Sequence, residues 1–332
     1  MSTHKHWSKP EGNFRVPSGP PFISQRFSKW SAPVDNPQPR LQRLHTLPGT
    51  ASVSVLRLDE VDPYVTGNKG FKLKHNLLNL QAGGHARLLT FGGAYSNHLV
   101  AVAAAGQRLG VETIGVVRGE LIEPLNPRLS FALRCGMRLH AMTRADYQHK
   151  ESEQILSGLR ATYGDFYCIP EGGSNALGVR GCEEITDFLR WGSSAKKRVV
   201  ALACGTGSTM AGLIRGLTMR SATGIEVVGI SVINAPGVMA DAVSSWLDND
   251  AGSSGIRWRT IDDCHFGGYA KTSPELRDFV AKYSSLHDMP LEPVYTGKLF
   301  WWLNRELQSG QLQEDTEVIL IHSGGLFPDE MP

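Results

Sequence analysis

The sequence predicts an α/β protein built from two open, mostly parallel, twisted sheets with helices on both faces. Short runs of apolar and β-branched residues alternate along the chain with segments of helical length, an order typical of parallel sheets covered by helices. The chain has 332 residues, which is long enough for about two such domains. Because no tandem repeat or low-complexity linker divides it, we expect the chain to cross between the two domains.

The predicted strands are short runs of the apolar and β-branched residues that favour buried strands. They cover residues 53–58, 86–91, 111–117, 137–142, 165–170, 198–204, 225–232 and 317–322. Between them, residues 97–110 and 175–192 have the length and pattern of helices. The first 44 residues are rich in Pro, Ser and charged side chains, and they predict a partly mobile N-terminal extension.

Composition excludes several classes of function. The formal net charge of +2 gives no indication of a nucleic-acid or membrane partner. The five cysteines are widely spaced and never form C-x-x-C, which argues against a disulfide framework or a zinc site. No metal-binding histidine pair occurs, so no metal is expected. Without a long apolar run or a signal-like start, the default expectation is a cytoplasmic protein.

Glycine-rich loops follow four of the predicted strands. They are FGGAYSNH (91–98), PEGGSNALG (170–178), CGTGST (204–209) and HSGG (322–325). In parallel sheets ligands bind beyond the carboxyl ends of the strands, so these loops are candidate walls of one site. Residues 204–209 offer backbone N–H groups and hydroxyls at a helix N-terminus, as a phosphate site requires. The alternative is that these Ser, Thr and Asn residues only cap helices.

A cluster of lysines precedes the second predicted strand, in the segment TGNKGFKLK (66–74). Three leucines, Leu73, Leu77 and Leu80, fit one face of a helix that starts near Lys69. The helix dipole and the like charge of Lys72 would both lower the pKa of Lys69, as a reactive amine requires. A solvated basic patch is the alternative. An amine that can form a Schiff base, together with a phosphate site, points to pyridoxal 5′-phosphate (PLP).

Two tyrosines lie next to glycines in turn-like segments. They are Tyr269 in HFGGYAK (265–271) and Tyr295 in EPVYTGK (292–298). Each could belong to an active site, or could be a half-buried packing residue with a solvated hydroxyl. A nucleotide-dependent α/β enzyme is a further alternative for residues 204–209, although the Walker and dinucleotide-binding motifs are missing.

Taken together, the motifs resemble one known family. In the order GNKGFKLK, LLTFGGAYSNH, PEGGSNALGVRG, ACGTGST, HFGGYAK, EPVYTGK and LIHSGG, they are similar to the 1-aminocyclopropane-1-carboxylate (ACC) deaminases and D-cysteine desulfhydrases. These are PLP-dependent enzymes with the tryptophan synthase β-like fold, fold type II. The resemblance covers residues 45–325. It implies a homodimer, a larger PLP-binding domain of residues 45–71 and 173–332, and a smaller inserted domain of residues 72–172.

The resemblance also implies roles for individual residues. Lys69 corresponds to the Schiff-base lysine, Lys72 to a partner of the cofactor phosphate, and Ser96 to the nucleophile or base. Asn97 corresponds to the partner of the cofactor 3′-oxygen. The expected phosphate loop is Gly205, Thr206, Gly207, Ser208 and Thr209. Tyr269 and Tyr295 correspond to the two active-site tyrosines. The residues expected to contact an amino-acid substrate are Ser96, Asn97, His98, Gly173, Ser174, Tyr269 and Tyr295.

The sequence departs from the family pattern at several positions near these motifs. Thr66 and Phe71 flank the lysine, and the bulky pair Trp301 and Trp302 follows the second tyrosine. Thr296 stands where ACC deaminases have a glutamate, as in the desulfhydrases. A hydroxyl does not favour a protonated pyridine nitrogen, so the resemblance implies β-elimination of the D-cysteine desulfhydrase type. The alternatives are ACC deamination, or a PLP-binding member with a different or lost activity.

Overall fold

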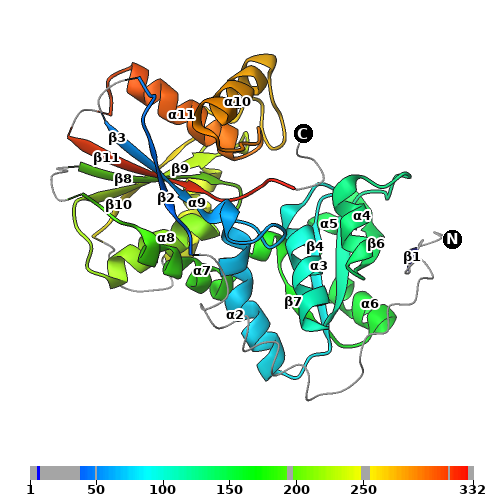
Figure 1. Ribbon diagram of the computed structural model, residues 1–332. Helices are drawn as coiled ribbons and strands as arrows, with labels where there is room; N and C mark the ends of the chain where they lie inside the picture. Colours follow the sequence, from blue (N-terminus) through cyan, green and yellow to red (C-terminus); the bar gives the residue numbers. More distant parts are fainter. Residues whose placement is uncertain are drawn as a thin grey trace. The chain divides into compact units, whose positions relative to one another are not determined.

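The computed structural model describes residues 6–7, 38–48, 51–192, 197–247, 255–312 and 315–327 (Figure 1). Contacts divide these residues into two compact units. The larger unit contains residues 38–72 and 176–326, and the smaller unit contains residues 6–7, 73–175 and 327. The division falls between Lys72 and Leu73, inside the helix α2 (Asn68–Ala82).

The larger unit is built on a sheet with the strand order β10-β9-β8-β11-β3-β2. These strands are β2 (Leu41–Leu44), β3 (Ser52–Arg57), β8 (Lys197–Cys204), β9 (Ile225–Ser231), β10 (Arg257–Ile261) and β11 (Thr316–His322). Every neighbouring pair is parallel except β2 with β3. The carboxyl ends of the five parallel strands therefore point to the same edge of the sheet.

Helices cover both faces of this sheet (Figure 1). Along β11, Val318 and Leu320 join the apolar core formed with α10 (Pro274–His287) and α11 (Thr296–Gln308). Ile319 and Ile321 join the core on the other face. The helices there are α7 (Ala176–Glu183), α8 (Ser208–Met219) and α9 (Val238–Leu247), with the 3₁₀ helix η3 (Glu184–Phe188). Because both faces are covered, β11 is apolar at consecutive positions.

The smaller unit has its own sheet, with the order β1-β6-β5-β4-β7. These strands are β1 (His6–Trp7), β4 (Arg87–Gly92), β5 (Glu112–Arg118), β6 (Arg138–Met142) and β7 (Tyr167–Ile169), and only β1 is antiparallel to its neighbour. Its helices include α3 (Asn97–Leu109), α4 (Pro127–Arg134), α5 (Arg144–Gln148) and α6 (Glu153–Tyr163). Leu73, Leu77 and Leu80 of α2 are buried, as the leucine spacing predicts.

The fold class predicted from the sequence is confirmed, and each predicted strand overlaps an observed one. The strands that the sequence did not reveal lie at sheet edges, where alternating polar side chains hide the pattern. One of them, β2, falls within the predicted N-terminal extension of residues 1–44, which is therefore wrong for residues 41–44. Most of that extension, including residues 8–37, lies outside the described residues.

Two further differences have local causes. The helix predicted over residues 175–192 changes to a 3₁₀ helix after Glu183, where the Thr186 hydroxyl donates to the Glu183 carbonyl at 2.6 Å. Phe327 belongs to the smaller unit, although the sequence placed residues 173–332 in the larger domain. Its ring packs edge-on against Phe131, with 5.4 Å between centroids.

Candidate active site

The candidate site of the larger unit lies in loops that follow its parallel strands. The loop after β3 leads through the 3₁₀ helix η1 (Leu58–Glu60) to Lys69. The loops after β8, β10 and β11 carry residues 205–207, 262–271 and 323–325. Since these strands run parallel in one sheet, their loops lie at the same edge, where α/β proteins bind ligands.

The lysine loop is held tightly against the loop that follows β11. Gly67 has a φ of +63°, and a Cβ there would lie 1.8 Å from the carbonyl oxygen of Ser323. The backbone N–H of Asn68 donates to the same carbonyl at 3.2 Å. Thr66 is buried and its hydroxyl donates to the backbone of Asp59 at 3.3 Å. Only glycine permits this approach at position 67, and the approach fixes the start of α2.

Lys69 is the second residue of α2, and its side chain keeps partial contact with solvent. Burial of the amine, with a smaller contribution from the charge of Lys72, lowers its pKa to about 7. Within the described residues, no carboxylate forms an ion pair with Lys69 that would hold its proton. At pH 7 the Lys69 amine is therefore neutral in about half of the molecules, and the neutral amine is the form that attacks a carbonyl.

Lys72 lies almost one turn further along α2 and is 2% exposed. Burial lowers the pKa of its amine, while the nearby thiols of Cys182 and Cys204 act in the opposite direction. Cys204 immediately precedes the turn at Gly205, so the charge of Lys72 lies near that turn. This position fits a partner for an anion bound there.

The turn after β8 leads directly into α8. Gly207 is the N-cap of α8, with a φ of +74° and no side-chain cap. A Cβ at this position would lie 3.1 Å from the Val243 side chain. The amide of Asn68 donates to the Thr209 hydroxyl at 2.9 Å, which ties the start of α2 to the start of α8. Thr206 is exposed, and its hydroxyl lies 3.2 Å from that of the buried Ser208.

Both tyrosines named by the sequence analysis come together in the larger unit. The rings of Tyr269 and Tyr295 pack edge to face with 6.0 Å between centroids. Tyr269 is 44% exposed, so its hydroxyl can reach a ligand. A Cβ at Gly205 would lie 3.3 Å from the Tyr295 ring, which places this ring against the turn that precedes α8. The two tyrosines and the turn therefore belong to one candidate site.

Thr296 is fully buried and bonded to Glu292, a residue that the sequence analysis missed. The Thr296 hydroxyl accepts a hydrogen bond from the Glu292 backbone at 2.9 Å and lies 3.1 Å from its carboxylate. That carboxylate also accepts from the backbone N–H groups of Val294, Tyr295 and Thr296. Glu292 thus caps α11 and fixes Tyr295, an arrangement that an acidic residue just before a helix can signal.

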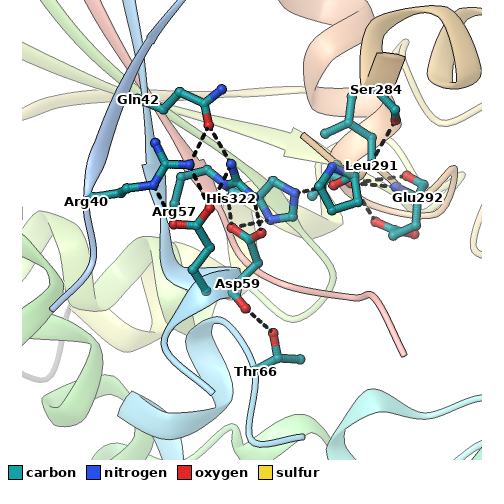
Figure 2. Close-up of polar contacts among 12 residues, drawn as sticks. Arg40, Gln42, Arg57, Asp59, Thr66, Ser284, Leu291, Glu292 and His322 are labelled. Atoms are coloured by element: carbon teal, nitrogen blue, oxygen red, sulfur yellow. Dashed lines mark hydrogen bonds and ion pairs between the residues drawn. The ribbon is translucent and has the colours of Figure 1, made fainter. Parts of the chain in front are cut away.

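A buried polar network, also missed, surrounds Asp59 in the segment that leads to Lys69 (Figure 2). The guanidinium of Arg57 binds the carboxylate of Asp59 through two contacts, at 2.9 and 2.7 Å. His322, at the end of β11, places its Nδ1 3.2 Å from the same carboxylate and donates from Nε2 to the Pro290 carbonyl at 2.8 Å. The network connects the loops after β3 and β11 with the segment that leads to Glu292.

The smaller unit carries the remaining predicted residues after β4 and β7, which are parallel neighbours. Ser96 caps α3 by accepting from the Leu99 N–H at 3.3 Å. The Asn97 amide oxygen accepts from Arg128, which also donates to the Tyr95 carbonyl at 2.9 Å. Both Ser96 and Asn97 keep partial exposure, so capping and ligand contact are compatible here.

His98, which was predicted to contact the substrate, is instead buried inside the smaller unit. It is 2% exposed, and its Nε2 lies 2.9 Å from the hydroxyl of Thr90. Because that hydroxyl donates to the Ile169 carbonyl at 2.7 Å, the histidine must be the donor. The expectation of substrate contact at His98 is therefore corrected: this ring links β4, α3 and β7 inside the smaller unit.

Gly173 and Ser174 follow β7 in a tight glycine turn, the 3₁₀ helix η2 (Glu171–Gly173). Gly172 and Gly173 both have a φ of +69°. Gly173 is buried and Ser174 is partly exposed. The next residue, Asn175, exchanges two amide hydrogen bonds with Asn76 of α2, at 2.7 and 3.1 Å. The turn is thus fixed to α2 within its own unit, with Ser174 accessible to a ligand.

The larger unit fits PLP by its own chemistry. The cofactor needs an amine for its aldehyde, and Lys69 is a partly exposed residue whose amine has a lowered pKa. It needs an anion site for its phosphate, and the glycine cap of α8 supplies one without a side-chain cap, near the buried Lys72. The Asn68–Thr209 hydrogen bond holds the two parts together. The residues present therefore fit the group.

Comparison with known proteins shows the family to which the chain belongs. The sequence model of the family "Pyridoxal-phosphate dependent enzyme" matches residues 35–324, and the chain belongs to this family. It is thus a PLP-dependent enzyme of fold type II. The comparison rules out the nucleotide-dependent alternative for residues 204–209.

Two relatives and one crystal structure are similar to this protein over most of its chain. A "putative 1-aminocyclopropane-1-carboxylate deaminase" of Pyrococcus horikoshii is 29% identical, over 83% of this chain and 85% of the relative. The mitochondrial "bifunctional D-cysteine desulfhydrase/1-aminocyclopropane-1-carboxylate deaminase" of Arabidopsis thaliana is 30% identical, over 85% of this chain and 74% of the relative. A crystal structure described as an ACC deaminase homologue has a TM-score of 0.72 at 25% identity, covering 93% of this chain and 96% of its own.

Two further observations concern the described residues alone. None of their helices is both long enough and apolar enough to cross a membrane. They contain no group of three or more His, Cys, Asp or Glu side chains placed to hold a metal ion.

Proposed function

We propose that this enzyme eliminates the β-substituent of a small amino acid in the manner of D-cysteine desulfhydrase. D-cysteine and water would give pyruvate, hydrogen sulfide and ammonia. The observation that carries this choice is Thr296, a buried hydroxyl at the position where ACC deaminases have a carboxylate. Similarity to relatives with both activities supports the reaction class.

The proposed roles follow from the positions of the side chains. Lys69 would hold the cofactor at its aldehyde carbon and would take the proton from the substrate α-carbon. The phosphate would bind at Gly205, Thr206, Gly207, Ser208 and Thr209, with Lys72 nearby. PLP supplies the electron sink that stabilises negative charge on that carbon. Thr296, whose hydroxyl contacts Glu292, would offer the ring nitrogen a neutral hydroxyl in place of a carboxylate.

Substrate contacts are proposed for both units. Tyr269 is exposed enough to orient the substrate or to protonate the leaving group, and Tyr295 supports it. From the smaller unit we propose Ser96, as nucleophile or base, and Asn97, as partner of the cofactor 3′-oxygen. Gly173 and Ser174 contact the substrate. A homodimer and a cytoplasmic location, both expected from the sequence, are part of the same proposal.

Product analysis tests this function. PLP-reconstituted protein should release pyruvate from D-cysteine and from β-chloro-D-alanine, and Lys69→Ala should abolish release. Lys282→Ala is the matched control, because Lys282 is an exposed lysine of α10. Formation of 2-oxobutyrate from ACC, with no pyruvate from either D-amino acid, would replace the proposal with ACC deamination.

A family member that binds PLP without this activity is the second candidate, since the two tryptophans after Tyr295 could close the substrate site. The structure argues against that cause. Trp302 is fully buried in the core beneath α11, and Trp301 packs edge-on against Phe266 and Phe279 at 5.2 Å each. A protein that takes up PLP but is inert towards D- and L-amino acids and ACC would support this candidate.

A further inference from the structure

Lys298, which the proposed function does not use, is a fully buried lysine. It lies in the first turn of α11, and its side chain is 0% exposed. Its ammonium donates to the carbonyl of Gly268 at 2.9 Å and lies 3.5 Å from that of Val232. Lysines are almost never fully buried unless they are paired. Here its acceptors are two backbone carbonyls, and the nearer one lies beside Tyr269.

The burial of Lys298 has an electrostatic cost. Burial lowers the pKa of its amine to about 8, and the charge of Glu292 offsets only part of this effect. Among the described residues, no carboxylate forms an ion pair with it. A methionine would fill the same space without that cost. The stability of the core therefore does not explain why a lysine occupies this position. Its hydrogen bond to the Gly268 carbonyl does explain it.

The Gly268 carbonyl belongs to a loop with unusual backbone geometry. Phe266, Gly267, Gly268 and Ala270 all have positive φ angles, of 52°, 91°, 124° and 56°. Two of these residues are not glycine, and such conformations persist only where surrounding contacts impose them. Within the loop, Gly268 N–H donates to His265 and Lys271 N–H donates to Gly268, both at 3.1 Å.

A second contact from the same helix supports the same loop. Trp301 lies three residues after Lys298, on the same side of α11, and its ring packs against Phe266 with 5.2 Å between centroids. Tyr295, immediately before α11, packs against Tyr269. Within the described residues, Tyr295 and α11 thus contact residues 265–271 at three points, and the Lys298 contact is to the residue next to Tyr269.

We propose that Lys298 is a positioning residue that fixes the loop of residues 265–271, and thereby holds Tyr269 against Tyr295 for substrate binding. The effect of Lys298 on substrate binding rests on the proposed function, whereas its effect on the loop does not. Lys298 itself touches neither the substrate nor the cofactor in this role.

Amide hydrogen exchange of the cofactor-free protein tests directly whether Lys298 fixes the loop of residues 265–271. Lys298→Met should speed amide exchange in residues 265–271 by about tenfold or more, the effect of losing one charged hydrogen bond. Its melting temperature should stay equal or rise, because the buried charge is gone. Lys282→Met, on the exposed face of α10, should change neither. If Lys298→Met does not fold by circular dichroism, Lys298→Gln serves instead and should show the same faster exchange to a smaller degree.

A second measurement tests the link to substrate. In Lys298→Met, PLP affinity should be unchanged, while KM for the amino acid rises about tenfold, with a smaller change in kcat. Unchanged exchange in the folded variant would overturn the proposal. Faster exchange with an unchanged KM would overturn the substrate link alone. If wild-type protein binds no PLP, the proposed function fails, and the exchange result still decides the role of Lys298.

Discussion

His322 and Asp59 are in contact inside the larger unit, with 3.2 Å between Nδ1 and Oδ1, although neither residue is close to the other in the sequence. The contact is not aligned as a hydrogen bond at Nδ1. The aligned bond is on the other nitrogen, where Nε2 donates to Pro290 at 2.8 Å. His322 therefore connects the loop before Lys69 with the segment that precedes Tyr295 (Figure 2).

Amide substitutions at His322 separate these two contacts. The amide nitrogen of glutamine takes the place of Nε2, whereas that of asparagine takes the place of Nδ1. We expect His322→Asn to lower the free energy of unfolding by about 1–3 kcal/mol, because it leaves the buried Pro290 carbonyl unpaired. His322→Gln should lower the free energy of unfolding less, because its amide can still donate to Pro290. The lost contact with Asp59 matters little, since Asp59 keeps both contacts with Arg57. Urea denaturation measures both, and a larger cost for glutamine would contradict the assignment.

The lowered pKa of Lys69 predicts how cofactor uptake depends on pH. Only the neutral amine attacks the PLP aldehyde, so with a pKa of about 7 the uptake rate should rise about fivefold from pH 6 to pH 7 and less than twofold from pH 7 to pH 8. The growth of the visible absorbance band of bound PLP measures this rate. An ordinary lysine would instead show a rate that keeps rising about tenfold per pH unit up to pH 9.

The same shift has a consequence for stability. The pKa of Lys69 is about 7 in the folded protein and near 10.5 when unfolded. Between these values the unfolded chain binds more protons, so the stability of the cofactor-free protein should increase with pH in this window. Lys69→Met should reduce that increase, as measured by melting temperatures at pH 7, 8.5 and 10. An equal increase in Lys69→Met and wild type would contradict the folded-state pKa.

Two glycines with similar backbone angles form a matched pair for the lysine loop. Gly67 and Gly84 have φ angles of +63° and +67°, but a Cβ at Gly84 would meet nothing within 4 Å. Gly84→Ala should cost about 1 kcal/mol from backbone strain alone. Gly67→Ala should cost about 3 kcal/mol or more and should weaken PLP binding, because its methyl group collides with Ser323. Equal effects in urea denaturation and PLP titration would contradict the close approach.

The sequence predicts most of the fold because the central strands are continuous apolar runs, as in residues 198–204. It fails at β10, whose exposed Arg257 and Arg259 break that pattern. Lys69 could be named because the residues around it form a recognisable motif. Lys298 and His322 could not be given roles, because the carbonyls that they bind are about 30 residues away in sequence. His98 was misassigned because its loop motif does not reveal that its side chain turns inward.

We expect Lys69, and no other lysine of the segment TGNKGFKLK, to hold the cofactor. Borohydride reduction of the PLP-loaded protein fixes the cofactor to the lysine that holds it, and peptide mass spectrometry then locates the modified residue. The expected result is a single pyridoxyl group on Lys69, and none in Lys69→Ala. Modification at Lys72 or Lys74 in the wild-type protein, or the absence of any pyridoxyl-lysine, would contradict it.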